Sequence, residues 1–164
     1  MKKVEIASKY SADKIMAAQG KTIECKKDIP HREQQRLINE VYLNTIDNHG
    51  IESAIKKKIS GYKAQDKKSG DPDRLLNLIT YEETMEKLVC SKLKCYYCSA
   101  EMKVLYFKAR EPLQWTLDRI NNDLGHTETN TVIACMGCNL QRRRRSADAF
   151  TFTKKLQIKK EGDS

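Results

Sequence analysis

Two Cys-x-x-Cys pairs constrain the fold of this chain more than any other feature. Cys95 and Cys98 form the first pair, and Cys135 and Cys138 form the second. Four thiolates at this spacing are typical of one tetrahedral metal site with a closed shell. The pattern therefore predicts a zinc ribbon whose metal is structural. The alternatives are two buried pairs without metal, or a redox dithiol, although the βαβ context of thioredoxin-like motifs is absent.

Length and charge narrow the class of protein. A chain of 164 residues suits one ordinary domain or a small domain with an extension. The formal net charge of +9 favours a polyanionic partner, with nucleic acid first. The sequence begins without the apolar core of a signal peptide and contains no run of about 18 apolar residues, so we expect no membrane partner. We expect an intracellular protein of the cytoplasm or nucleus, including those of a virus-infected host, where paired cysteines favour metal over disulfides.

The first part of the chain has helical patterns and a basic character. Apolar residues at helical spacing predict a helix over 31–48 that ends at His49-Gly50, and a second helix from Ile51 toward residue 69. A Gly/Pro break then separates a helical basic extension, 1–72, from a second domain, 73–164. Lys63 and Lys67 in the extension are candidate nucleic-acid contacts; the alternative is a helical scaffold that packs on the ribbon.

The second part mixes helices and strands. Thr80 and Glu83 have the spacing of a capping box, which predicts a short helix with Cys90 as a small core residue. Strands are predicted over 104–107, 115–117 and 131–134, and a helix with a basic side over 136–150. A polar loop, 121–130, joins the last two strands. The pattern therefore predicts an α+β fold.

A longer motif runs from Trp115 to Arg142. Behind the first cysteine pair, the order is Leu-Asp-Arg, Gly-His, Asn and then Cys-x-x-Cys-Asn. This order resembles the Asp-Arg variant of the HNH (ββα-metal, His-Me finger) endonuclease family, over about a third of the chain. The resemblance implies a zinc-ribbon-stabilised HNH domain after a helical extension. It also implies hydrolysis of phosphodiester bonds, in double-stranded DNA by our expectation, with Mg²⁺ or Mn²⁺.

The resemblance assigns roles to particular residues. An ion that assists phosphodiester cleavage needs few, hard oxygen ligands. The resemblance implies that Asp118 and Asn139 bind one such ion, and that Asn130 ties the backbone of the loop. The alternatives are a hairpin-capping Asp and a helix-start Asn. Arg142 and Arg143 are expected to face phosphate, although arginine runs are often solvated surface.

The general base is the point where the sequence departs from the family. After the metal-binding Asp most members have a His, whereas this chain has Arg119, which cannot take a proton at neutral pH. Arg119 resembles a phosphate clamp instead. His126 is the nearest candidate base, and the alternative for it is a turn contact. Because Asp118 and Arg119 would face opposite sides of a regular strand, both can serve one site only if the strand ends or bulges there.

Three functions are consistent with these patterns. The first is a metal-dependent HNH endonuclease. The second is a zinc-ribbon nucleic-acid-binding protein without cleavage, suggested by the missing His. The third is a protein-interaction module, which treats the positions of Asp118, Asn130 and Asn139 as coincidence.

Overall fold

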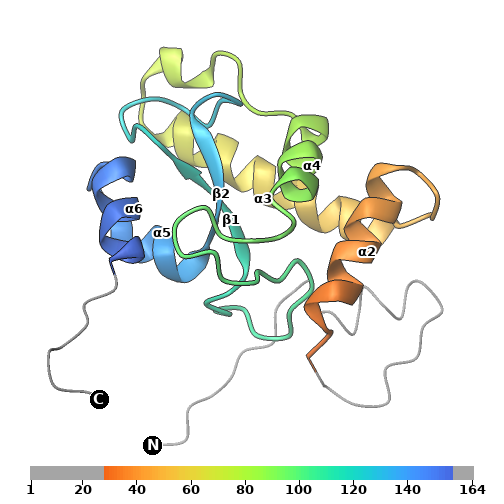
Figure 1. Cartoon of the computed structure of the whole chain (residues 1–164). Coiled ribbons are helices and arrows are strands. Elements are labelled where there is room, and N and C mark those ends of the chain that lie inside the picture. The colour runs from red at the N-terminus through yellow and green to blue at the C-terminus, as the bar shows by residue number, and fades with distance from the viewer. Residues whose placement is uncertain (1–27, 157–164) are drawn as a thin grey trace, which may run out of the picture.

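The computed structural model describes residues 28–156, which form an α+β fold (Figure 1). None of the helices in this part of the chain is both long enough and apolar enough to cross a membrane. In chain order the elements are α2 (His31–Tyr42), α3 (His49–Lys68), the 3₁₀ helix η1 (Pro72–Leu75), α4 (Tyr81–Cys90), β1 (Trp115–Arg119), β2 (Thr131–Cys135), α5 (Met136–Arg142) and α6 (Ala147–Lys155).

An antiparallel hairpin of β1 and β2 forms the centre of the fold. Trp115 pairs with Cys135, and the register continues without a bulge to Arg119, which pairs with Thr131. The strands predicted over 115–117 and 131–134 are confirmed. The helix α5 follows β2 directly, because Cys135 ends the strand and caps the helix by accepting a hydrogen bond from the amide of Cys138. In Figure 1, α5 and α6 lie on one side of the hairpin and α2 and α4 on the other.

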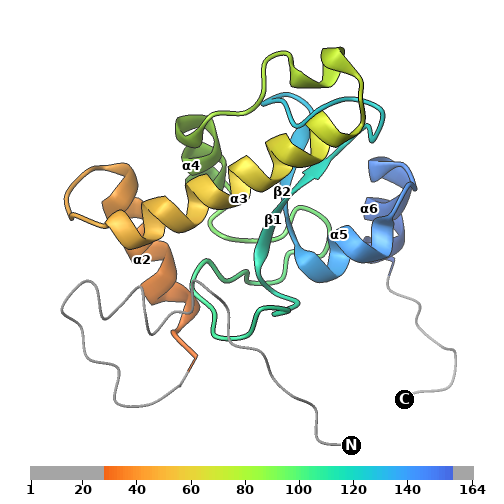
Figure 2. The same ribbon diagram turned by 180° about the vertical axis from the view of Figure 1, so that it is seen from behind.

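The helix α3 runs across the hairpin, as the view from behind shows (Figure 2). Its Tyr62 hydroxyl accepts a hydrogen bond of 3.1 Å from the amide of Leu117 in β1. Asn48 caps the start of α3 by accepting from the amide of Ile51. The predicted first helix was therefore too long: α2 ends at Tyr42, and His49 begins α3 instead of ending α2.

The strand predicted over 104–107 is absent, and a buried side chain explains why. The amides of Val104 and Leu105 both donate to Oε1 of Gln34 on α2, at 2.8 and 2.9 Å. These are the donors that a sheet ladder would have used. Only an isolated bridge between Lys103 and Gln114 joins this segment to the start of β1. A side chain 70 residues away in sequence thus replaces strand pairing.

Two further predictions near helix ends were wrong. The helix predicted over 136–150 is two helices, because Arg143 adopts a left-handed conformation with φ of 53° and Ser146 caps a new helix. Cys90 is exposed and not a core residue, because α4 buries the side that carries Met85 and Leu88, and Cys90 lies two residues beyond Leu88 on the other side. The capping box between Thr80 and Glu83 is confirmed, with both of its hydrogen bonds present.

One buried cluster joins the early helices to the hairpin. From α2 and α3 it takes Leu37, Ile38, Ile51 and Ile55, and from the hairpin it takes Trp115, Leu117, Ile133, Ala134 and Cys135. The helices before residue 72 therefore pack on the ribbon, as the scaffold alternative supposes. The division into separate domains at residue 72 stays a prediction.

Candidate functional site

The four cysteines of the two pairs converge on one point. Their Sγ atoms all lie within 4.8 Å of one another, and those of Cys98 and Cys135 are 3.9 Å apart. Zinc–sulfur bonds of about 2.3 Å at tetrahedral angles place sulfur atoms about 3.8 Å apart. The amide of Cys135 also donates to the sulfur of Cys95, at 3.3 Å. The cluster could therefore hold a metal ion such as zinc.

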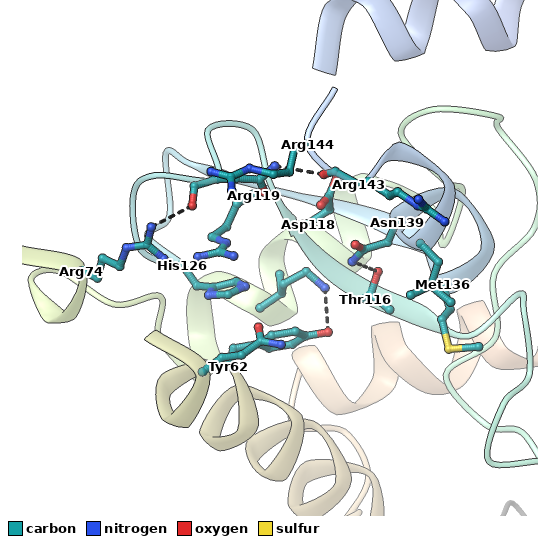
Figure 3. A pocket seen from close by; sticks show the side chains of 14 residues that line it. Tyr62, Arg74, Thr116, Asp118, Arg119, His126, Met136, Asn139, Arg143 and Arg144 are labelled. Atoms are coloured by element: carbon teal, nitrogen blue, oxygen red, sulfur yellow. Dashed lines mark hydrogen bonds between the residues drawn. The ribbon is translucent and has the colours of Figure 1, made fainter. Parts of the chain in front are cut away.

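A pocket of about 600 Å³ opens beside the hairpin (Figure 3). Asp118, Arg119, His126, Asn139 and Arg143 of the predicted site line it, whereas Asn130, Arg142, Lys63 and Lys67 do not. The other lining residues are Tyr62, Gln65, Arg74, Thr116, Leu117, Asn122, Met136, Leu140 and Arg144. Residues from α3, η1, β1, the 121–130 loop and α5 therefore meet in one pocket.

Asp118 is held by two side chains that the motif did not assign to it. Arg142 pairs with its carboxylate through both oxygens, Nε to Oδ2 at 2.7 Å and Nη2 to Oδ1 at 3.1 Å. The hydroxyl of Tyr97 donates to Oδ2 at 2.5 Å. Burial, and then this bond to Asp118, raise the pKa of Tyr97. Within residues 28–156, Oδ1 accepts one hydrogen bond, from Arg142, and so retains a lone pair.

The side chain of Arg142 thus points into the protein interior, whereas we expected it to face phosphate. Its side chain is 1% exposed, and besides Asp118 it donates to the carbonyls of Arg119 and Arg145. The physical reason is the position of α5, whose last turn places Arg142 against the buried carboxylate of β1. A buried carboxylate needs a cation or hydrogen-bond donors to offset its desolvation.

Asn139 is fixed beside the same strand. Its Nδ2 donates to Oγ1 of Thr116 at 3.0 Å, and Thr116 and Asp118 lie two residues apart on β1 and therefore share one face. Figure 3 shows the side chains of Asp118 and Asn139 among those that line the pocket. Within the described residues, Oδ1 of Asn139 has no hydrogen-bond donor. Two side-chain oxygens, one from Asp118 and one from Asn139, are thus available at this wall.

The opposite wall is organised by Asp66, a residue that the motif does not include. Its Oδ2 accepts from both the amide and Nδ1 of His126, each at 2.8 Å, and its Oδ1 lies 3.3 Å from Nη1 of Arg119. Asp66 is 0% exposed. A sequence signal for it existed, because Asp66 continues the helical spacing of the buried Ile51 and Ile55 of α3.

His126 lies between α3 and the pocket. Its ring centroid is 4.7 Å from that of Tyr62, and the residue is 3% exposed. Burial lowers the pKa of His126, against the smaller raising effect of its hydrogen bond to Asp66. A neutral ring that donates through Nδ1 leaves a lone pair on Nε2. In the described part of the chain nothing hydrogen-bonds to Nε2, so this atom is available to a group in the pocket.

Asp118 and Arg119 reach the pocket from opposite faces of β1. Asp118 turns toward α5, whereas Arg119 turns toward Asp66 of α3 and also donates to the carbonyl of Leu124. Both side chains still line the pocket, because β1 ends at Arg119. The pKa of Arg119 is lowered. Burial is the largest cause, and the nearby charge of Asp66 acts in the opposite direction.

Asn130 closes the loop that carries His126. Its Nδ2 donates to the carbonyls of Asn121 and Gly125, at 3.0 and 2.9 Å, and its Oδ1 accepts from the amide of Asn121 at 2.9 Å. The side chain therefore ties the backbone of the loop, which is the supporting role expected for it. It does not contact the pocket itself.

Cations surround the pocket. Arg74, Arg119, Arg143 and Arg144 line it, and Lys63 and Lys67 are exposed on α3. Arg144 pairs with Asp123 at the surface. Among the ion pairs of residues 28–156, none involves Lys63, Lys67 or Arg143. These side chains are free to meet an anionic partner.

Comparisons with known proteins find a viral relative of this chain. No family model matches the chain, and no solved structure matches it. An uncharacterized protein of Acanthamoeba polyphaga mimivirus is 30% identical over 145 residues, which cover 88% of this chain and 24% of that protein. The chain thus spans about a quarter of the length of the curated relative that it matches.

Proposed function

We propose that this chain is an HNH-type endonuclease that uses a divalent ion to hydrolyse phosphodiester bonds in double-stranded DNA. The observation that carries the proposal is the shared pocket. Asp118 and Asn139 present oxygens on one wall, and His126 and Arg119 lie on the other. Oxygen ligands, a candidate base and cations in one place are the components that phosphodiester hydrolysis requires.

The cysteine cluster has a structural role in this proposal. Four thiolates complete the coordination of Zn²⁺ and leave no position for water or substrate. The second pair joins β2 to α5, so metal binding there fixes Asn139, which follows Cys138 directly, relative to β1. Zinc would therefore hold the two oxygen-bearing side chains in place without touching the substrate.

The residues of the pocket fit a hard divalent ion in one particular arrangement. Oδ1 of Asp118 and Oδ1 of Asn139 would hold Mg²⁺ or Mn²⁺, while Arg142 and Tyr97 keep Oδ2 of Asp118 in position. Such an ion supplies charge neutralisation for the phosphate and for the departing oxygen. Arg119 then binds a phosphate oxygen, and His126 receives the proton of the attacking water.

The positive rim suits a phosphate backbone. Arg143 and Arg144 at the pocket, with Lys63 and Lys67 on α3, are exposed cations on the elements that build the site. Their contacts with duplex DNA would be sequence-independent, and each phosphate neutralised adds about 0.9 to the slope of log affinity against log salt concentration. We therefore expect DNA affinity to fall steeply with salt.

Cleavage of supercoiled plasmid in the presence of Mg²⁺ or Mn²⁺ tests the proposal. The zinc-loaded wild-type protein should cut, and Asn139→Ala should lose activity with its zinc content unchanged. Asn139 suits this purpose because, among the described residues, its side chain hydrogen-bonds to Thr116 alone. Asn39→Ala, the same substitution on the exposed face of α2, is the matched control and should cut normally. Equal cutting by Asn139→Ala and the control would contradict the proposal.

One observation favours a second candidate, a zinc-ribbon protein that binds nucleic acid without cutting it. The carboxylate of Asp118 is already paired with Arg142 and Tyr97, which is a stable arrangement without a divalent ion. This candidate predicts salt-sensitive DNA binding, and no cleavage by highly pure wild-type protein in either metal. The same plasmid assay, combined with a binding measurement, separates the two functions.

A further inference from the structure

The carboxylate of Asp66 has contacts with two different groups of the pocket. It is fully buried behind the pocket wall and does not line the pocket. From there it accepts hydrogen bonds from Nδ1 and the amide of His126, and it pairs with Arg119. A buried carboxylate is costly unless it is well satisfied, so this geometry defines a specific environment for it.

The bond to Nδ1 selects one tautomer of His126. A carboxylate only accepts hydrogen bonds, so the proton of the neutral ring must lie on Nδ1. Nε2 then carries the lone pair, and Nε2 has no hydrogen-bond partner in residues 28–156. Tyr62 stacks against the ring from the same helix, α3, and restricts its rotation. Two side chains one helical turn apart thus set the direction and tautomer of the imidazole.

If Asp66 only held the loop and β1 in place, its hydrogen bond to Nδ1 of His126 would not be needed. The amide of His126 and the guanidinium of Arg119 already join the loop and β1 to Asp66. The additional bond to Nδ1 is the one that decides where Nε2 points and what it can accept. Without it, the ring has no other hydrogen bond in the described part of the chain.

We propose that Asp66 is the positioning residue of this site: it holds His126 as the Nδ1–H tautomer with Nε2 toward the pocket, and it anchors Arg119 beside it. The proposal rests on the function proposed above. Nε2 takes a proton from water, and the water oxygen bonds to phosphorus as the P–O bond to the leaving oxygen breaks. The leaving oxygen then takes a proton from solvent. Helix α3, which lies outside the recognisable motif, is thereby part of the site.

Imidazole nitrogen spectroscopy tests the proposal without any cleavage assay. Long-range ¹H–¹⁵N spectra of the zinc-loaded full chain should show His126 with its proton on Nδ1 and a lone pair on Nε2. His31 and His49 are the chain's other histidines and serve as internal references, with His126→Gln assigning the signals. A wild-type spectrum with the proton on Nε2, or with both tautomers in exchange, overturns the proposal.

The variant Asp66→Asn tests the same contact by substitution. It keeps the shape of the side chain but lacks the charge, and should give tautomer exchange at His126. Turnover, kcat, should fall by roughly 10²-fold or more, with KM for DNA changed by less than about threefold. Glu52→Gln removes a partly exposed carboxylate from the first turn of the same helix and should change neither kcat nor KM. An unchanged His126 spectrum or unchanged kcat in folded Asp66→Asn would contradict the assignment.

The two proposals can fail separately. If the wild type does not cut DNA in either metal, the endonuclease proposal fails, while the wild-type spectrum still decides whether Asp66 sets the tautomer. If the wild type cuts and Asp66→Asn cuts equally well, only the positioning role fails. If Asp66→Asn does not fold, the wild-type spectrum alone supports or overturns the assignment.

Discussion

Arg142 forms a buried, two-pronged ion pair with Asp118 that joins the last turn of α5 to β1. An arginine after Asn-x-x beside a phosphate site is expected at the surface, yet this one is 1% exposed and paired with Asp118. The sequence identifies the residue types. It does not show how deeply Asp118 on β1 is buried, because that burial depends on how α5 packs on β1. The four cysteines, in contrast, were predicted to form one cluster from their spacing in the sequence alone. Asp66 was missed because it lies among the exposed residues Lys63, Lys67 and Lys68. In sequence this segment has the composition of a solvent-exposed helix face, although Asp66 is buried.

Replacing Arg142 by Met should be strongly destabilising. Asp118 would keep a buried carboxylate without its cation, which costs about 3 to 5 kcal/mol in comparable pairs. Urea unfolding in the presence of zinc measures the loss. Arg143→Met removes an exposed neighbour and should change stability by less than about 0.5 kcal/mol. The double variant with Asp118→Asn should recover part of the loss, and a double variant no better than Arg142→Met would argue against the pair.

His126 should make the protein less stable in acid. Burial places its pKa in the folded state below the ordinary 6.5, so the unfolded chain binds a proton at higher pH than the folded chain does. The contribution to stability is complete above about pH 6.5 and is lost as the pH falls toward the folded pKa. Urea midpoints between about pH 7.5 and pH 5 should decline more steeply for wild type than for His126→Gln. Parallel declines would show that this histidine titrates normally.

Elements with local signals were predictable, and those that depend on distant partners were not. The capping box at Thr80 determined the start of α4, and short runs of aromatic, β-branched and apolar residues located β1 and β2. The segment 104–107 has the composition of a strand, but its amides are taken by Gln34 from α2. No pattern within the segment could have indicated that contact. The break after α5 likewise depends on a left-handed Arg143, which propensity disfavours.

The contact between η1 and the 121–130 loop gives a prediction with an internal control. A Cβ at Gly125 would lie 2.0 Å from the carbonyl oxygen of Arg74, so Gly125→Ala must displace one of the two backbones. We expect a loss of about 1 to 3 kcal/mol. Gly61→Ala, in the middle of α3 with nothing within 4 Å, should instead stabilise by about 0.5 to 1 kcal/mol. Thermal unfolding of both variants tests this, and equal effects would contradict the close approach.

The cysteine cluster links the turn at 95–98 to the end of β2 and the first turn of α5, and its loss should destabilise all three segments. Cys135→Ser removes a ligand at the junction of β2 and α5, so we expect loss of bound zinc and of the cooperative thermal transition. Cys90→Ser, at an exposed cysteine outside the cluster, should retain both. Metal analysis and circular dichroism during heating measure the outcome. A native-like transition in zinc-free Cys135→Ser would show that the cluster is not a structural metal site.

At the scale of the whole molecule, the packing predicts a single cooperative unit and not two domains. Helices α2 and α3 supply Gln34 to the 104–105 backbone, Ile51 and Ile55 to the shared core, and Asp66 to the pocket. A fragment of residues 73–164 would lose all of these contacts at once and expose the apolar face of the hairpin. We expect it to bind zinc poorly and to unfold without a sharp transition, because buried area on this scale contributes most of a small domain's stability.

Complementation distinguishes lost contacts from a damaged fragment. Adding residues 28–72 as a separate chain should restore a cooperative transition and zinc retention to the 73–164 fragment, since the missing side chains return without a covalent link. With Asp66→Asn in the added chain, folding should return while the tautomer signature of His126 does not, because its carboxylate partner is lost. A 73–164 fragment that melts sharply with zinc bound and no added chain would instead establish a domain boundary near residue 72, and would make α3 a separable part of the site.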